Sequence, residues 1–112
     1  MAIRMNTRWW PLTGPGIARL AGHMGVYQLG DAAGNVLYVG VASGRSRFGL
    51  RGELEQVLAA LPAGAAQYRS EVTTAYLSRW QELLMVHVAD FGSVPVHNSV
   101  RDAASLGRLS PK

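Results

Sequence analysis

Apolar and polar positions along the 112-residue chain repeat with two different periods, which predicts a mixture of strands and helices. Residues 26–29 and 36–39 are β-branched, aromatic and aliphatic, and the polar stretch between them is rich in glycine, aspartate and asparagine. This pattern predicts a β-hairpin. Residues 67–73 alternate more weakly and predict a third strand, with Tyr68 and Val72 on the same face.

Apolar residues recur at helical spacing in two later segments, which predicts amphipathic helices over residues 49–61 and 75–91. We expect the buried stripes to be Leu50, Leu54, Val57, Leu58 and Leu61 on the first helix, and Leu77, Trp80, Leu84 and Val88 on the second. Gly92 is positioned to end the second helix. A shorter helix is predicted over residues 14–21, with Thr13 as its N-terminal cap.

These elements predict one small α/β domain, a three-stranded mixed or antiparallel sheet with helices packed against it. We divide the chain into a basic, aromatic segment with a short helix (residues 1–22), the domain itself (residues 23–98) and a C-terminal tail (residues 99–112). Trp9 and Trp10 in the first segment are expected to pack against the domain, and stacking on unpaired bases is the alternative.

Composition adds a basic charge balance to this picture. The formal net charge is +4 with a pI near 10.1, and ten of the eleven basic residues are arginine. Arginine binds phosphate oxygens bidentately, so the charge favours a polyanionic partner, although GC-rich coding would also enrich arginine. No cysteine is present, which excludes disulfides and thiolate metal sites. No apolar run is long enough for a membrane span, and we expect a cytoplasmic protein.

Two tripeptides in the hairpin are near mirror images, Gly25-Val26-Tyr27 and Tyr38-Val39-Gly40. They are followed by Arg51 at the start of a helix, Glu82 on the last long helix, and Asn98 in a Pro-x-x-Asn element. With these motifs in this order the chain resembles the GIY-YIG nuclease superfamily from about residue 24 to residue 98. The resemblance implies a GIY-YIG-like fold, a small three-stranded sheet flanked by helices.

The resemblance also implies roles for individual residues. Glu82 would bind Mg²⁺ or Mn²⁺, because carboxylate oxygens suit hard cations. Arg51, with Arg47 as the reserve, would clamp the scissile phosphate. Tyr27 or Tyr38 would position or deprotonate the attacking water. The expected substrate-binding groups are Arg45, Arg47 and Asn98, and Glu71 is the second candidate carboxylate.

The first predicted function is therefore a metal-dependent DNA endonuclease or nicking domain, with specificity supplied by a homodimer or a partner protein. Val41 stands directly after the second tripeptide, where active members commonly have lysine. The second hypothesis is thus a catalytically degenerate module that binds nucleic acid or a protein without cleavage, and a small-ligand or stress-associated protein is the third. The nuclease hypothesis requires the hydroxyls of Tyr27 and Tyr38, the guanidinium of Arg51 or Arg47 and the carboxylate of Glu82 to converge on one concave surface.

Overall fold

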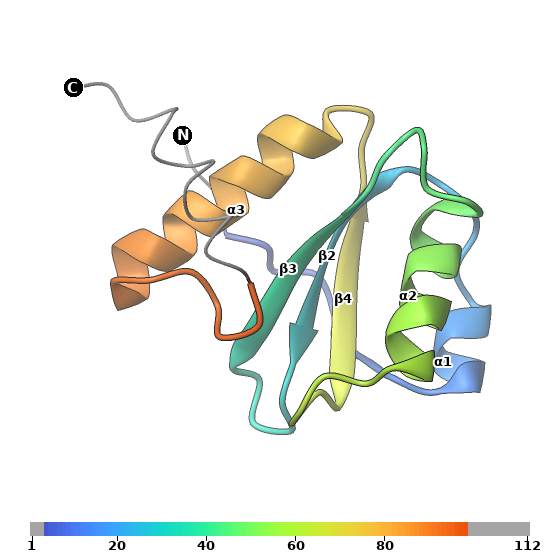
Figure 1. The fold of residues 1–112 in the computed structure, drawn as a ribbon, viewed down its shortest axis with the longest axis horizontal. Helices are drawn as coiled ribbons and strands as arrows, with labels where there is room; N and C mark the ends of the chain where they lie inside the picture. The colour runs from blue at the N-terminus through green and yellow to red at the C-terminus, as the bar shows by residue number, and fades with distance from the viewer. Residues whose placement is uncertain (1–3, 99–112) are drawn as a thin grey trace.

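A four-stranded antiparallel sheet lies between two layers of helices in the computed structural model, which describes residues 4–98 (Figure 1). The strands are β1 (Trp10–Pro11), β2 (Gly25–Gly30), β3 (Val36–Ala42) and β4 (Gln67–Val72), and the helices are α1 (Gly14–Ala18), α2 (Gly49–Ala59) and α3 (Tyr76–Phe91). The strand order is β1-β4-β2-β3. Helices α1 and α2 cover one face of the sheet, and α3 crosses the other (Figure 1).

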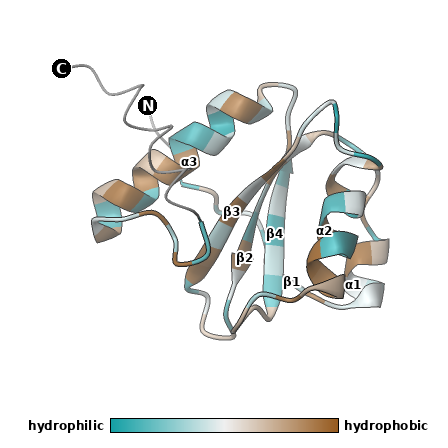
Figure 2. Ribbon diagram, in the orientation of Figure 1, coloured by the Kyte–Doolittle hydropathy of each residue, from teal (hydrophilic) through white to brown (hydrophobic). Residues whose placement is uncertain are grey.

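The central strand β2 is buried along its whole length because both of its faces are covered. On the face of α1 and α2, the aromatic and aliphatic side chains of Tyr27, Leu29 and Tyr68 pack against Leu50 and Leu54. On the face of α3, a second cluster consists of Met5, Val26, Val39, Leu83 and Leu84. Hydrophobic colour accordingly runs along β2 and β3 between the helix layers (Figure 2).

The predicted hairpin is confirmed, and its turn follows from local hydrogen bonding. The Asp31 carboxylate accepts hydrogen bonds from the backbone amides of Ala33 and Asn35 and from the Asn35 side chain. Such side-chain hydrogen bonds satisfy backbone amides that have no backbone partner in a turn. Gly34 has a φ of 91°, which glycine adopts without a steric penalty.

The sheet has four strands where the sequence predicted three. The additional strand is β1, whose Trp10 and Pro11 lie opposite Tyr68 and Gln67 of β4. Two residues are too short for an alternating pattern, and proline is normally tolerated only at sheet edges, which is where β1 lies. The segment before residue 23 thus contributes both a strand and a helix to the same core. The predicted tail, residues 99–112, is outside the described residues.

Helix α3 is rotated relative to the predicted buried stripe. Leu84 is buried and Trp80 packs against the same cluster, as predicted. Leu83 is buried as well, whereas Leu77 is 55% exposed and Val88 is 36% exposed. Apolar residues lie around much of the circumference of this helix, so the spacing alone did not determine which side faces the sheet. The expected cap of α1 is confirmed, since the Thr13 hydroxyl accepts from Gly16 N, but the helix ends at Ala18. None of the described helices is long and apolar enough to cross a membrane.

Candidate functional site

The two mirror-image tripeptides meet across β2 and β3 in a steric pairing. Tyr27 lies directly opposite Gly40 in the antiparallel register, and its ring occupies the space that a side chain at position 40 would need. Tyr38, on the same face of the sheet, has its ring centroid 6.0 Å from that of Tyr27. Close packing therefore explains the tyrosine of the first tripeptide and the glycine of the second, independently of catalysis.

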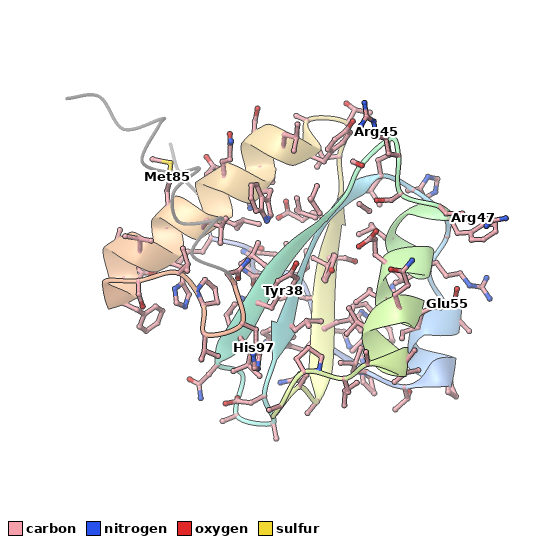
Figure 3. All side chains as sticks on the ribbon, in the orientation of Figure 1. Tyr38, Arg45, Arg47, Glu55, Met85 and His97 are labelled. Atoms are coloured by element: carbon pink, nitrogen blue, oxygen red, sulfur yellow. The ribbon has the colours of Figure 1, made fainter. Side chains whose placement is uncertain are left out.

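The two tyrosines line a pocket of about 280 Å³ between β3, α2 and the segment that follows α3. Its polar lining also includes Glu53, Gln56 and His97. Figure 3 shows Tyr38 and His97 on the side of β3 that faces α2. The His97 ring is fixed by a 2.9 Å contact between Nε2 and the carbonyl of Ala63. The pocket thus combines two phenols, a carboxylate, an amide and an imidazole.

The Tyr27 hydroxyl is unsuited to the role of general base. Burial raises the pKa of this phenol far above its usual value, and the neighbouring Tyr38 and Glu53 side chains raise it further. The Tyr27 hydroxyl is also hydrogen-bonded to Tyr38. A phenolate here would be buried beside a carboxylate, so Tyr27 stays neutral and can only donate or accept hydrogen bonds.

Glu53 and His97 were not among the candidates derived from the sequence. A signal for Glu53 was present, because it lies three residues after Leu50 and four before Val57 on the apolar stripe of α2. A half-buried carboxylate at that position must face the sheet. For His97 no comparable signal existed, since its place depends on how the chain returns from α3 to β3.

Glu82, the predicted metal ligand, does not join the tyrosines. It belongs to α3, which packs on the opposite face of the sheet (Figure 1). Its carboxylate accepts a hydrogen bond from Arg79, whose guanidinium also binds Glu71 at 2.8 Å and 3.0 Å. The expected convergence of Tyr27, Tyr38 and Glu82 is therefore contradicted, and Glu71, the second candidate carboxylate, lies in the same ion-pair network.

The residues around Glu82 do not fit a divalent cation. Arg79 bridges Glu71 and Glu82 and already compensates their charge. Among residues 4–98, no three histidine, aspartate or glutamate side chains gather in a way that could hold a metal ion. Mg²⁺ is commonly bound through one or two carboxylates, but here a guanidinium already binds both of them and its positive charge opposes a cation.

Arg51 lies on the exposed side of α2 and makes a long ion pair with Glu55, with 3.5 Å between Arg51 Nε and Glu55 Oε2. Both side chains are about half exposed, so the pair contributes little to stability. Arg51 is not part of the pocket lining. It does lie one turn after Arg47, at the start of the helix.

Asn98, predicted to bind substrate, lies buried against β3, and its substrate-binding role stays a prediction. Its side chain is buried, with Oδ1 accepting from the Val39 amide at 2.9 Å and Nδ2 donating to the Val39 carbonyl at 3.0 Å. The carboxamide pairs with β3 as the backbone of a neighbouring strand would. It thereby covers part of a sheet edge that would otherwise carry open hydrogen-bonding groups.

Arg45 and Arg47 lie on a short loop between β3 and α2 and point away from the body of the molecule (Figure 3). The loop is held by its serines: Ser43 N donates to Ser46 Oγ, and Ser46 N donates to the Ser43 carbonyl. Neither arginine forms an ion pair with any residue of the range 4–98. Two charged groups are therefore presented to solvent by an ordered loop.

Phe48 ends this loop in an unusual backbone conformation. Its φ is 63°, in the left-handed region that costs a residue with a side chain about 1–2 kcal/mol. Its ring is 66% exposed and lies 5.4 Å from the Arg47 guanidinium. The Phe48 backbone begins α2, with its carbonyl accepting from Gly52 N, but the ring is left exposed, which makes Phe48 a candidate binding residue.

Trp9 and Trp10 pack against neighbouring residues, which was the first of the two expectations for them. The guanidinium groups of Arg8 and Arg19 lie over the Trp10 ring, 4.4 Å and 3.8 Å from its centroid. Trp9 packs over Gly30 and against Arg69 at 4.3 Å. Because these faces are already occupied, the indoles are poorly placed to stack on bases.

Fold and site together define a small α/β protein with a four-stranded antiparallel sheet, a tyrosine-lined pocket on one face and an arginine-bearing loop at the start of α2. The chain belongs to the family described as Domain of unknown function (DUF7508), which it matches over residues 3–90. His97 and Asn98 lie beyond the matched residues. None of the curated proteins compared with the chain matches it.

Proposed function

We propose that this protein is a nucleic-acid-binding module that contacts the phosphate backbone and does not cleave it. The observation that carries the proposal is the ordered loop from Ser43 to Phe48, which presents Arg45 and Arg47 without ion-pair partners among residues 4–98. Arg51, one turn further on, is held only by an exposed pair with Glu55. Exposed guanidinium groups bind phosphate oxygens through charge-assisted hydrogen bonds.

Phe48 supports the same proposal for unpaired strands. An exposed aromatic ring beside arginines is the combination with which proteins stack single-stranded bases while neutralising their backbone. The loop offers no set of polar groups suited to reading base edges, so binding is expected to be independent of sequence. Specificity, where needed, would come from a homodimer or a partner protein.

The proposal includes a GIY-YIG-like fold. The strand order β4-β2-β3, with β1 added at the edge beside β4, supports this part of the proposal. The non-cleaving form is favoured because Glu82 lies across the sheet from the tyrosines and Tyr27 stays protonated. Activity as a Mg²⁺- or Mn²⁺-dependent endonuclease stays a prediction. It is tested below because Tyr27, Tyr38, Glu53 and His97 line one pocket.

Two measurements on the full chain test the proposal. Fluorescence anisotropy with labelled single-stranded and double-stranded DNA of one length should show binding to both at low salt, with the single strand bound more tightly. Supercoiled plasmid incubated with the protein and Mg²⁺ or Mn²⁺ should remain intact across pH. Absence of binding at low salt would overturn the proposal, and so would nicking that the substitution Glu53→Gln abolishes.

Phe48→Gly separates a binding role from a structural one. Glycine adopts the left-handed conformation without strain, so the variant should be more stable by about 1 kcal/mol in urea unfolding. Loss of the ring should at the same time weaken binding to single-stranded DNA by roughly tenfold, the effect of one lost stacked base. Phe91→Ala, which removes another exposed phenylalanine, should leave the binding unchanged. Unaltered binding by Phe48→Gly would remove the stacking role.

A further inference from the structure

A second, larger groove lies on the face of the sheet that α3 covers, away from the tyrosine pocket and from the Arg45 loop. Its volume is about 740 Å³, and it runs between the hairpin, α3 and the segment near Met5. Most of its wall is apolar, formed by Met5, Val36, Leu37, Leu83, Val86 and Val94. A groove of this size and lining is within the range of small-molecule sites.

One charged group in this groove forms no ion pair with any residue between 4 and 98. Arg69 of β4 lines the groove, half buried, and its Nε donates to Gln28 Oε1 at 2.8 Å while the Trp9 ring lies against its guanidinium. Within residues 4–98, no carboxylate forms an ion pair with Arg69. Glu71, two residues away, is bound to Arg79. Burial lowers the pKa of Arg69, an effect that the Glu71 charge only partly opposes.

The other basic groups of the groove are already engaged. Arg4 binds Asp90 through two nitrogens. His87 Nδ1 lies 2.7 Å from the Ser93 carbonyl. Of the basic groups in the groove, Arg69 would therefore bind an anion most strongly, because its guanidinium is oriented by Gln28 and Trp9 and partly removed from water.

We propose that this groove binds a small amphipathic organic anion, a carboxylate carrying an aliphatic or aromatic body. The carboxylate would pair with the terminal nitrogens of Arg69, and the apolar body would lie against Leu83, Val86 and Val94. A nucleic-acid backbone does not fit this lining, since it has no apolar body to bury. The site is thus separate from the proposed nucleic-acid surface, and its failure would leave that surface untouched.

Octanoate is the probe that combines the two required features. Titration of the full chain, followed by calorimetry and by tryptophan fluorescence, should give a dissociation constant below about 1 mM. Acetate lacks the apolar body and octanol lacks the charge, so each should bind at least about tenfold more weakly. The midpoint of thermal unfolding should rise with octanoate and not with acetate at equal concentration.

Arg69→Gln tests the anion contact, and Arg8→Gln is its matched control. Each variant removes one positive charge and one guanidinium packed on an indole, but Arg8 packs on Trp10, outside the groove. Arg69→Gln should weaken octanoate binding by about tenfold or more, whereas Arg8→Gln should bind as the unmodified chain does.

Three results would overturn the assignment: no binding of octanoate, equal binding of octanol, or equal losses in the two variants. Gln28→Leu provides a second variant if Arg69→Gln fails to fold. It keeps the Arg69 charge and removes one of the two groups that orient the guanidinium, so octanoate binding should weaken while the net charge stays constant. Unchanged binding by Gln28→Leu would contradict the orienting role.

Discussion

At the scale of single residues, the paired tripeptides can be understood from packing alone. The Tyr27 ring lies over Gly40 of the neighbouring strand, and a methyl group at position 40 would overlap it. Gly40→Ala should therefore displace the tyrosine and reduce the free energy of unfolding by about 1–3 kcal/mol. Gly14→Ala, where a methyl group would meet no atom within 4 Å, should change it by less than about 0.5 kcal/mol. Urea denaturation measures both values, and equal values would disprove the steric explanation.

The same tyrosine predicts a pH dependence. The pKa of Tyr27 is raised by burial in the folded protein, while a phenol in the unfolded chain titrates near pH 10. The contribution of this group is therefore constant below about pH 10 and is lost as the pH rises further, because only the unfolded chain releases the proton. Tyr27→Phe should show a shallower loss of stability than the unmodified protein above about pH 10.

This comparison is made by urea unfolding at a series of alkaline pH values. Parallel curves for Tyr27→Phe and the unmodified chain would mean that Tyr27 titrates normally, and a general-base role would again be open.

At the scale of secondary-structure elements, the edge strand β3 depends on the segment that follows α3. The Asn98 carboxamide satisfies both the amide and the carbonyl of Val39, and the Trp80 indole donates to the same carbonyl at 3.0 Å. Asn98→Ala should cost about 1–3 kcal/mol, since it leaves a buried amide without a partner. Asn6→Ala, at an exposed position, is the control and should be close to neutral.

Thermal and urea unfolding measure these two changes. A neutral Asn98→Ala would show that water replaces the carboxamide and that the segment does not protect the edge.

Element type was predictable from the sequence wherever the local signal was strong. The hairpin was expected from its β-branched runs and turn residues, β4 from its alternation, and α2 and α3 from helical spacing. β1 was not, since its pairing with β4 is a tertiary contact of two residues. The rotation of α3 was also missed, because an apolar surface on several sides of a helix does not identify the buried one.

At the scale of the whole molecule, the residues of the predicted site lie on opposite faces of the sheet. The sequence motifs correctly brought Tyr27 and Tyr38 together, because a hairpin is a local structure. They could not place Glu82, whose position depends on which face of the sheet α3 covers. Glu53 and His97 instead complete the tyrosine pocket, one through the register of α2 and the other through the chain returning to β3.

Charged groups are paired to different extents in different parts of the molecule, which affects where a polyanion can bind. Acidic and basic groups on the α3 face largely neutralise one another, as in the Arg79 and Arg4 pairs. The arginines of the loop before α2 stay exposed to solvent. A polyanion bound at this loop should have an affinity that falls as the salt concentration rises.

The salt dependence of DNA binding tests the central claim most directly. For the unmodified chain, the logarithm of the association constant should fall linearly with the logarithm of the salt concentration. In the double variant Arg45→Gln and Arg47→Gln, the slope should be smaller by about 1 for each arginine that contacts a phosphate. Arg4→Gln, which changes a paired arginine on the α3 face, should keep the slope of the unmodified chain. An unchanged slope in the double variant would contradict the assignment of this loop as the phosphate-binding surface.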